Sequence, residues 1–174
     1  MNIREKIFEH ILRKQPKRKV SFPRWENVHT IVLLFESDYV EKNPVIRHLA
    51  NSCAAEETDK SITLLGYTDK KNIISANLPQ SRILGRKDFT IFGTPKSNIR
   101  EELIRRPYDL LIDLTQKDNL QMRYLAMYIN ADFKTGRHIR EGIHDLMLDM
   151  PAQESPEFLF GQIIYYLKLI KSND

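Results

Sequence analysis

The sequence predicts an α/β fold: a Rossmann-like three-layer sandwich with a mostly parallel sheet of five or six strands, plus an N-terminal amphipathic helix. Short, nearly continuous apolar runs at 30–35 and 108–114 are typical of strands that are covered on both faces. Helix-like segments alternate with these runs, and this favours right-handed crossovers with helices on both faces of the sheet. A chain of 174 residues, of which 41% are hydrophobic, has the size and composition of one globular domain.

The N-terminal part of the chain differs from the rest. Apolar side chains recur at helical spacing over residues 2–14, and a basic run follows them. Residues 1–30 hold 8 Lys or Arg against 3 Asp or Glu, whereas residues 31–174 hold 19 against 20. We therefore divide the chain into a basic N-terminal helix and arm, residues 1–27, and a nearly neutral single Rossmann-like α/β domain, residues 28–174.

The elements of this domain follow from apolar patterning and from residues that cap helices. Ser155 and Pro156, for example, are favoured as the cap and the first residue of a helix. The stretch 68–88 lacks regular patterning, so we interpret it as a loop with a short strand at 73–76. In chain order we expect strands at 30–35, 61–67, 89–92, 108–114, 131–134 and 143–148, and helices at 40–55, 97–106, 118–130 and 155–170.

Composition restricts the compartment and the partners. The single cysteine, Cys53, cannot form an internal disulfide, so an oxidising compartment is not indicated. The charged N-terminus has no apolar segment of the kind found in signal peptides, and no apolar run is long enough to span a bilayer. We therefore expect a cytoplasmic protein. Because the body of the chain is nearly neutral, we do not expect it to bind nucleic acid.

The sequence gives no indication of a cofactor or a metal. Loops that bind the phosphates of nucleotides need glycines so that backbone N–H groups can approach the ligand, but the first strand is followed by Glu36-Ser37-Asp38. The five histidines are scattered and lack the spacing of metal ligands. We expect neither a nucleotide cofactor nor a metal.

Candidate site residues lie where the expected strands end, because open α/β sheets bind ligands beyond the carboxyl ends of their strands. Asp113 interrupts an apolar strand, where a charge is costly unless it is paired. It is either an acid that faces a ligand or, as we favour, a carboxylate that caps the next helix or pairs with an arginine. Basic residues in the 68–88 loop and at 134–137 either bind an anion or lie on a solvated surface. The candidates are Asp38 and Asp113 for catalysis, and Ser37, Arg82, Arg86, Thr115, Lys134, Gly136 and Arg137 for ligand binding.

The basic arm has three interpretations. Its apolar stripe can pack on the domain, which is the commonest fate of an amphipathic helix. Alternatively, residues 1–19 can contact an anionic membrane surface, with the basic run reinforcing the contact. The third interpretation is non-specific contact with nucleic acid.

Two sequence segments resemble a known enzyme family. The run 108–114 (YDLLIDL), followed by a helix and the segment 131–137 (ADFKTGR), resembles the acceptor-side, N-terminal domain of heptosyltransferase-like GT-B glycosyltransferases. The segment 43–49 (NPVIRHL) is similar to an early helix of the same family. This resemblance implies that Asp38 occupies the position of the catalytic aspartate and Asp113 that of an aspartate at a strand end.

The chain departs from that family in two ways. Ser37 stands where the family has a glycine, and 174 residues leave no room for the domain that binds the nucleotide-sugar donor. As a whole, the chain is more similar to a small family of single-domain bacterial proteins, through its segments LPQSRILGRKDF and YDLLIDLT. That second resemblance implies no activity.

Three functional hypotheses follow. The first is a non-catalytic or regulatory α/β domain that binds a protein partner or an anionic small molecule. The second is an enzyme, or the remnant of one, related to glycosyltransferases and using Asp38 and Asp113. The third is a membrane-peripheral protein anchored by the basic N-terminal helix. We favour the first because the motifs of nucleotide, metal and nucleophilic chemistry are missing from the sequence.

Overall fold

The computed structural model describes residues 2–37, 42–70, 80–139, 142–151 and 153–170. A six-stranded sheet forms the centre of the fold, and all of its strands are parallel. The strand order is β3-β2-β1-β4-β5-β6, which is the order of the dinucleotide-binding Rossmann fold. The strands are β1 (Thr30–Glu36), β2 (Ser61–Tyr67), β3 (Ser81–Leu84), β4 (Pro107–Asp113), β5 (Asn130–Arg137) and β6 (Leu146–Leu148).

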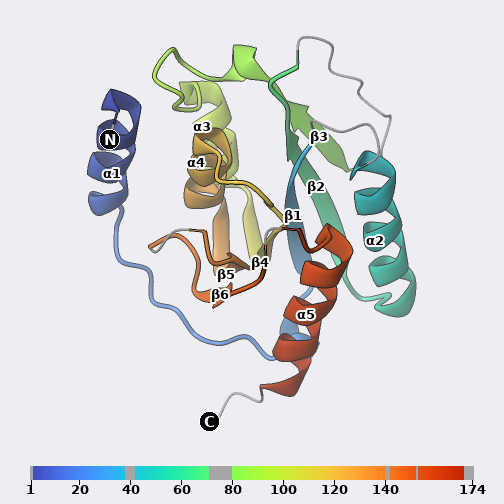
Figure 1. The fold of residues 1–174 in the computed structure, drawn as a ribbon. Coiled ribbons are helices and arrows are strands. Elements are labelled where there is room, and N and C mark those ends of the chain that lie inside the picture. Colours follow the sequence, from blue (N-terminus) through green and yellow to red (C-terminus); the bar gives the residue numbers. More distant parts are fainter. Residues whose placement is uncertain (1, 38–41, 71–79, 140–141, 152, 171–174) are drawn as a thin grey trace.

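Helices cover both faces of the sheet, so the predicted three-layer α/β sandwich is confirmed. Helices α2 and α5 lie on one face, and α3 and α4 lie on the other with α1 outside α4 (Figure 1). The core accordingly has two parts, one on each side of the sheet. The helices are α1 (Ile3–Arg13), α2 (Lys42–Glu56), α3 (Ser97–Arg105), α4 (Leu120–Tyr128) and α5 (Pro156–Leu169).

Helix α1 packs against α4 through a buried aromatic pair. Phe8 is completely buried, and its ring meets the ring of Tyr124 edge to face at 4.9 Å between centroids. The guanidinium group of Arg123 lies over the Phe8 ring and donates hydrogen bonds to the carboxylate of Glu5 at 2.8 and 3.0 Å. The apolar stripe of the helix therefore faces the domain, as the first interpretation of the arm expects.

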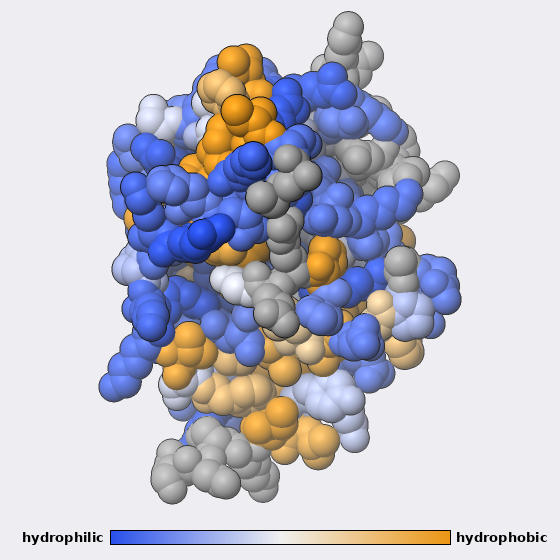
Figure 2. All heavy atoms as spheres, turned by 60° about the vertical axis from the view of Figure 1, so that its left-hand side comes forward, coloured by the Kyte–Doolittle hydropathy of each residue, from blue (hydrophilic) through white to orange (hydrophobic). Residues whose placement is uncertain are grey.

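The arm that follows α1 runs to the opposite face of the sheet. Phe22 packs edge to face against Phe133 of β5, and Trp25 belongs to the core on the side of α2 and α5. Figure 1 shows this segment passing from α1 beneath β5 and β6 toward α5. The surface seen from the side of α1 is mainly hydrophilic, with hydrophobic side chains gathered toward its top and bottom (Figure 2).

Two sequence predictions about strands are wrong. Residues 81–84 form β3, although they were assigned to a loop; β3 is the edge strand beside β2, and only its last residue is buried. Residues 89–92 do not form a strand: Phe89 makes one isolated antiparallel bridge to Pro95, and Ile91 is 79% exposed in a turn. The expected short strand at 73–76 lies outside the described residues.

The fifth strand is longer than predicted and the sixth is shorter. β5 continues through Arg137, so Gly136 and Arg137 lie within the strand, which was expected to end at Lys134. β6 covers only Leu146–Leu148 of the expected 143–148. This extension of β5 decides where the predicted site residues point, because successive side chains of a strand face opposite sides of the sheet.

Candidate functional site

A buried polar cluster lies at the carboxyl ends of β4 and β5. The Asp113 carboxylate accepts hydrogen bonds from the backbone N–H and the hydroxyl of Thr115, and its second oxygen lies 3.0 Å from Nε2 of His144. The side chains of Asp113 and His144 are only 6% and 7% exposed. Asp113, at the end of β4, is thus paired with Thr115 and His144. Neither partner is the arginine that was considered from the sequence.

At Gly136, β4 and β5 lie so close together that a side chain would crowd the neighbouring atoms. A Cβ atom at this position would lie 3.0 Å from Cβ of Asp113 and 3.1 Å from Nε2 of His144. Such distances are shorter than ordinary van der Waals contacts, so a side chain here would push the pair apart. Gly136 therefore supports the Asp113–His144 contact by leaving room for it.

The switch point of the sheet, between β1 and β4, is occupied by the protein's own groups. The buried carboxylate of Glu36 accepts hydrogen bonds from the backbone N–H groups of Gln116 and Lys117, both at 3.2 Å. Above it, Arg137 donates to the carbonyl oxygens of Gln116 and Glu154 at 3.4 and 3.3 Å. At this place an internal carboxylate therefore engages the backbone N–H groups that follow β4.

The remaining predicted site residues lie apart from this cluster. Arg82 pairs with Glu102, and Arg86 pairs with Asp69 at 3.2 Å. Arg82 lies in β3 and Arg86 lies just after it. β3 is four strands from β5, and this separation corresponds to roughly 19 Å across the sheet. They do not join Arg137 in one anion site. Backbone N–H of Ser37 donates to a β2 carbonyl, and Asp38 lies outside the described residues.

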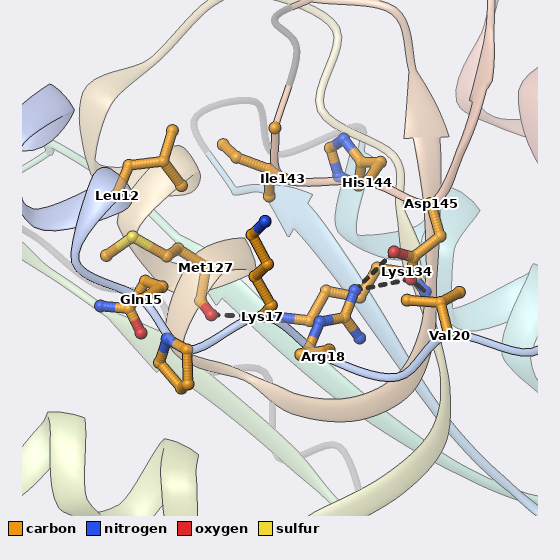
Figure 3. Close-up of a pocket in the computed structure, with 12 residues that line it drawn as sticks. Leu12, Gln15, Lys17, Arg18, Val20, Met127, Lys134, Ile143, His144 and Asp145 are labelled. Carbon is orange, nitrogen blue, oxygen red and sulfur yellow. Dashed lines mark hydrogen bonds and ion pairs between the residues drawn. The ribbon is translucent and has the colours of Figure 1, made fainter.

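A cavity of about 470 Å³, which we call the arm cavity, lies between the arm and the edge of the sheet. Its walls are the arm from Leu12 to Val20, the end of α4 at Met127, Lys134 of β5 and the segment 142–145. Figure 3 shows the ammonium group of Lys17 reaching into the cavity between Met127 and Ile143. The cavity thus combines an apolar wall with several charged side chains.

Arg18 links the arm to β5 and to Asp145, which lines this cavity. Its guanidinium group donates to both carboxylate oxygens of Asp145 at 2.6 Å and to the carbonyl oxygen of Ala131 at 2.7 Å. The Asp145 carboxylate also accepts the backbone N–H of Lys134 at 2.8 Å. The single acidic group among the described lining residues is therefore neutralised by an arginine of the same cavity.

Lys134 is the buried cation of the arm cavity. The residue is 3% exposed, and its Nζ donates hydrogen bonds to the carbonyl oxygens of Ala126 and Met127 at 2.7 and 2.9 Å. Burial, assisted by the positive charge of Arg18, lowers the pKa of the Lys134 ammonium to about 7, while Asp145 acts in the opposite direction. The Lys134 side chain thus caps the C-terminal end of α4 by donating hydrogen bonds to two of its last carbonyl groups.

Three residues of this region were not among the sequence candidates: Arg18, His144 and Asp145. Arg18 belongs to the basic run, but nothing local distinguishes it from its neighbours. His144 and Asp145 lie in a segment that we assigned to a strand. Their partners are 31 and 127 residues away along the chain, so no local pattern reveals them. Among the described residues, no cluster of His, Cys, Asp and Glu suits a metal ion, and no helix is long and apolar enough to cross a membrane.

Residues 2–170 match DUF6913, a family of unknown function. The chain belongs to this family. A search among curated proteins found no match.

Two solved structures of the same enzyme resemble the fold, in agreement with the resemblance noted from the sequence. The heptosyltransferase WaaC of E. coli with ADP shares 14% identity at a TM-score of 0.45, and the match covers 82% of this chain and 48% of that one. The same enzyme with ADP-2-deoxy-2-fluoro heptose shares 12% identity at a TM-score of 0.49, covering 82% and 50%. The chain thus spans about half the length of the enzyme, and we derive no function from the likeness.

Proposed function

We propose that this protein is a non-catalytic or regulatory domain that binds a small anionic molecule with an apolar body in the arm cavity. The observation that carries the proposal is the Lys17 ammonium, which reaches into the cavity and makes no hydrogen bond or ion pair with any described residue. A cation that extends into a pocket of ligand size is free to pair with the charge of a ligand.

The charges of the cavity favour an anion over a cation. Lys17 and Arg18 contribute positive groups, and Lys134 adds a third only when it is protonated, whereas Asp145 is the single carboxylate among the described lining residues. Arg18 already engages both oxygens of that carboxylate. A ligand cation would have to compete with this guanidinium group, but a ligand carboxylate or phosphate meets an available ammonium group.

The apolar wall of the cavity indicates that the uncharged part of the ligand is apolar. Leu12, Met127 and Ile143 line the cavity beside the cations. Small-molecule sites commonly combine apolar walls with a few charged groups that fix orientation. We therefore expect a carboxylate or phosphate that carries a hydrocarbon or aromatic body, in preference to a sugar phosphate.

The polar cluster at the carboxyl ends favours binding over catalysis. Both oxygens of Asp113 are engaged by Thr115 and His144, so this carboxylate has little capacity left for a substrate. The carboxylate of Glu36 likewise already engages the backbone N–H groups of Gln116 and Lys117. The alternative of a glycosyltransferase-related protein using Asp38 and Asp113 rests on the sequence resemblance alone.

The membrane alternative requires the N-terminal helix to detach. Phe8 lies in the core and Ile11 and Leu12 pack against it, so a membrane would compete with the domain for the same apolar stripe. Sedimentation with anionic liposomes tests this alternative. Binding that is weakened by a Lys17→Met, Lys19→Met double variant would support it.

Thermal shift measurements test the proposed ligand class. We expect phenylacetate to raise Tm in proportion to the logarithm of its concentration, and phenethylamine, its cationic counterpart, to have no effect. Lys17→Met should reduce the shift, whereas Lys19→Met should retain it, because Lys19 belongs to the same arm but does not line the cavity. Equal shifts in both variants, or equal shifts with both ligands, would refute the proposal.

A further inference from the structure

The buried lysine of the arm cavity has hydrogen-bond partners for two N–H groups only. Nζ of Lys134 donates to the carbonyl oxygens of Ala126 and Met127, and no other described group accepts from it. An ammonium group carries three N–H donors, whereas a neutral amine carries two donors and a lone pair. The described residues thus offer acceptors for the two N–H groups of a neutral amine, and the third N–H of an ammonium group would find no acceptor among them.

A neutral amine in this position is a nucleophile. The two carbonyl groups of α4 fix both of its N–H bonds, and the lone pair remains without a donor among the described residues. Burial and the nearby charge of Arg18 lower the pKa to about 7, so about half of the amine is neutral at that pH. Compared with an ordinary lysine, this is on the order of a thousandfold larger neutral fraction. Lysines desolvated in this way react with carbonyl compounds.

We infer that Lys134 forms a reversible imine with the carbonyl group of an anionic aldehyde or ketone, such as an aromatic oxo acid, that is held in the arm cavity. This inference rests on the proposed function, since the cavity supplies the binding of the anion. The carboxylate of the oxo acid pairs with Lys17, and its apolar body packs on Leu12 and Met127. The carbonyl carbon then lies within the same cavity as the amine.

The step balances with the two reactants alone. The Lys134 nitrogen bonds to the carbonyl carbon, and one amine proton moves to the carbonyl oxygen to give a carbinolamine. The carbon–oxygen bond then breaks, and the hydroxyl group leaves as water with the second amine proton. One imine and one water form from one amine and one carbonyl, without oxidant or reductant.

Phenylpyruvate and phenyllactate provide a matched pair of probes. Both carry the same carboxylate and the same aromatic body, but only phenylpyruvate has a carbonyl group that can form an imine. The full-length protein is incubated with each at pH 7.5, treated with sodium cyanoborohydride and analysed by peptide mass spectrometry. We expect a reduced adduct on Lys134 with phenylpyruvate and none with phenyllactate.

Variants and Tm measurements separate the inference from the proposed function. Lys134→Met removes the amine, and its phenylpyruvate adduct should be lost while Lys17 stays unmodified in both proteins. If that variant fails to fold, the unaltered protein still tests the inference through the ratio of labelling at Lys134 to labelling at Lys17. We expect this ratio to exceed a hundredfold. The neutral fractions of the two amines differ by roughly a thousandfold, which leaves room for a smaller ratio of labelling. Equal Tm shifts by both probes without an adduct on Lys134 would overturn the inference and leave the proposed function intact. No shift with either probe would overturn both.

Discussion

Replacement of Lys134 by methionine should change how the stability of the protein depends on pH. The pKa of the Lys134 ammonium is about 7 in the folded protein, against 10.5 for an ordinary lysine. Between these values the unfolded chain holds one more proton than the folded chain. The free energy of unfolding therefore rises with pH between about 7 and 10.5, and this gain in stability is lost as the pH falls to 7.

The size of the effect follows from the two pKa values. Integration of the proton difference from pH 7 to pH 9 gives about 2 kcal/mol of added stability in the protein with Lys134. Arg18 and Asp145 are the charged groups that act on Lys134. Tyr124, whose pKa burial raises to about 12, stays protonated below pH 9.

Urea denaturation followed by circular dichroism measures this dependence. Unfolding free energies are determined at half-unit steps from pH 7 to pH 9 for the unaltered protein and for Lys134→Met. Other titrating groups are common to both proteins, so the difference between the two curves isolates Lys134. We expect that difference to grow by about 2 kcal/mol in favour of the protein with Lys134. Parallel curves would refute the assignment of a neutral buried amine.

Five further substitutions test the packing. Phe8→Ala should cost about 3–5 kcal/mol in urea denaturation because Phe8 is fully buried, whereas Ile3→Ala, at an exposed position, should change stability by less than about 0.5 kcal/mol; equal effects would contradict the docking of α1. Gly136→Ala should destabilise by about 1–3 kcal/mol through contact with Asp113. Gly161→Ala, in open space within α5, should stabilise by about 0.5–1 kcal/mol, and the same sign of effect for both glycine substitutions would refute this reasoning. Asp113→Ala should cost about 1–3 kcal/mol because Thr115 and His144 lose a buried partner, and an unchanged midpoint would show that the pair contributes nothing.

The layers of the fold could be predicted from the sequence because each rests on local patterning. β1 and β4 are apolar over most of their length, and the Ser155–Pro156 start of α5 follows known capping preferences. β3 was missed because an edge strand needs no continuous apolar run, and Ser81–Leu84 buries only its last residue. Conversely, the alternation in Phe89–Phe92 resembles a strand although Ile91 points into solvent.

The candidate site was predictable only in part. Lys134, Gly136 and Arg137 were recognised as candidates, but the strand was expected to end at residue 134, because a lysine and a glycine are unusual inside a buried strand. The burial of Lys134 depends on where α4 ends, and the contact of Asp113 with His144 depends on a register between distant segments. Interactions of this kind are set by the tertiary structure, so they have no signature in a single sequence.

The segment from Pro16 to Pro23 makes no backbone–backbone hydrogen bond with any described residue, although it forms one wall of the arm cavity. A few side chains, chiefly Arg18 and Phe22, hold it in place. Opening the wall therefore requires no strand or helix to unfold, and amide hydrogen exchange in this segment should be much faster than in β5. Detachment of the arm would consequently widen the arm cavity while the sheet that carries Lys134 stays intact.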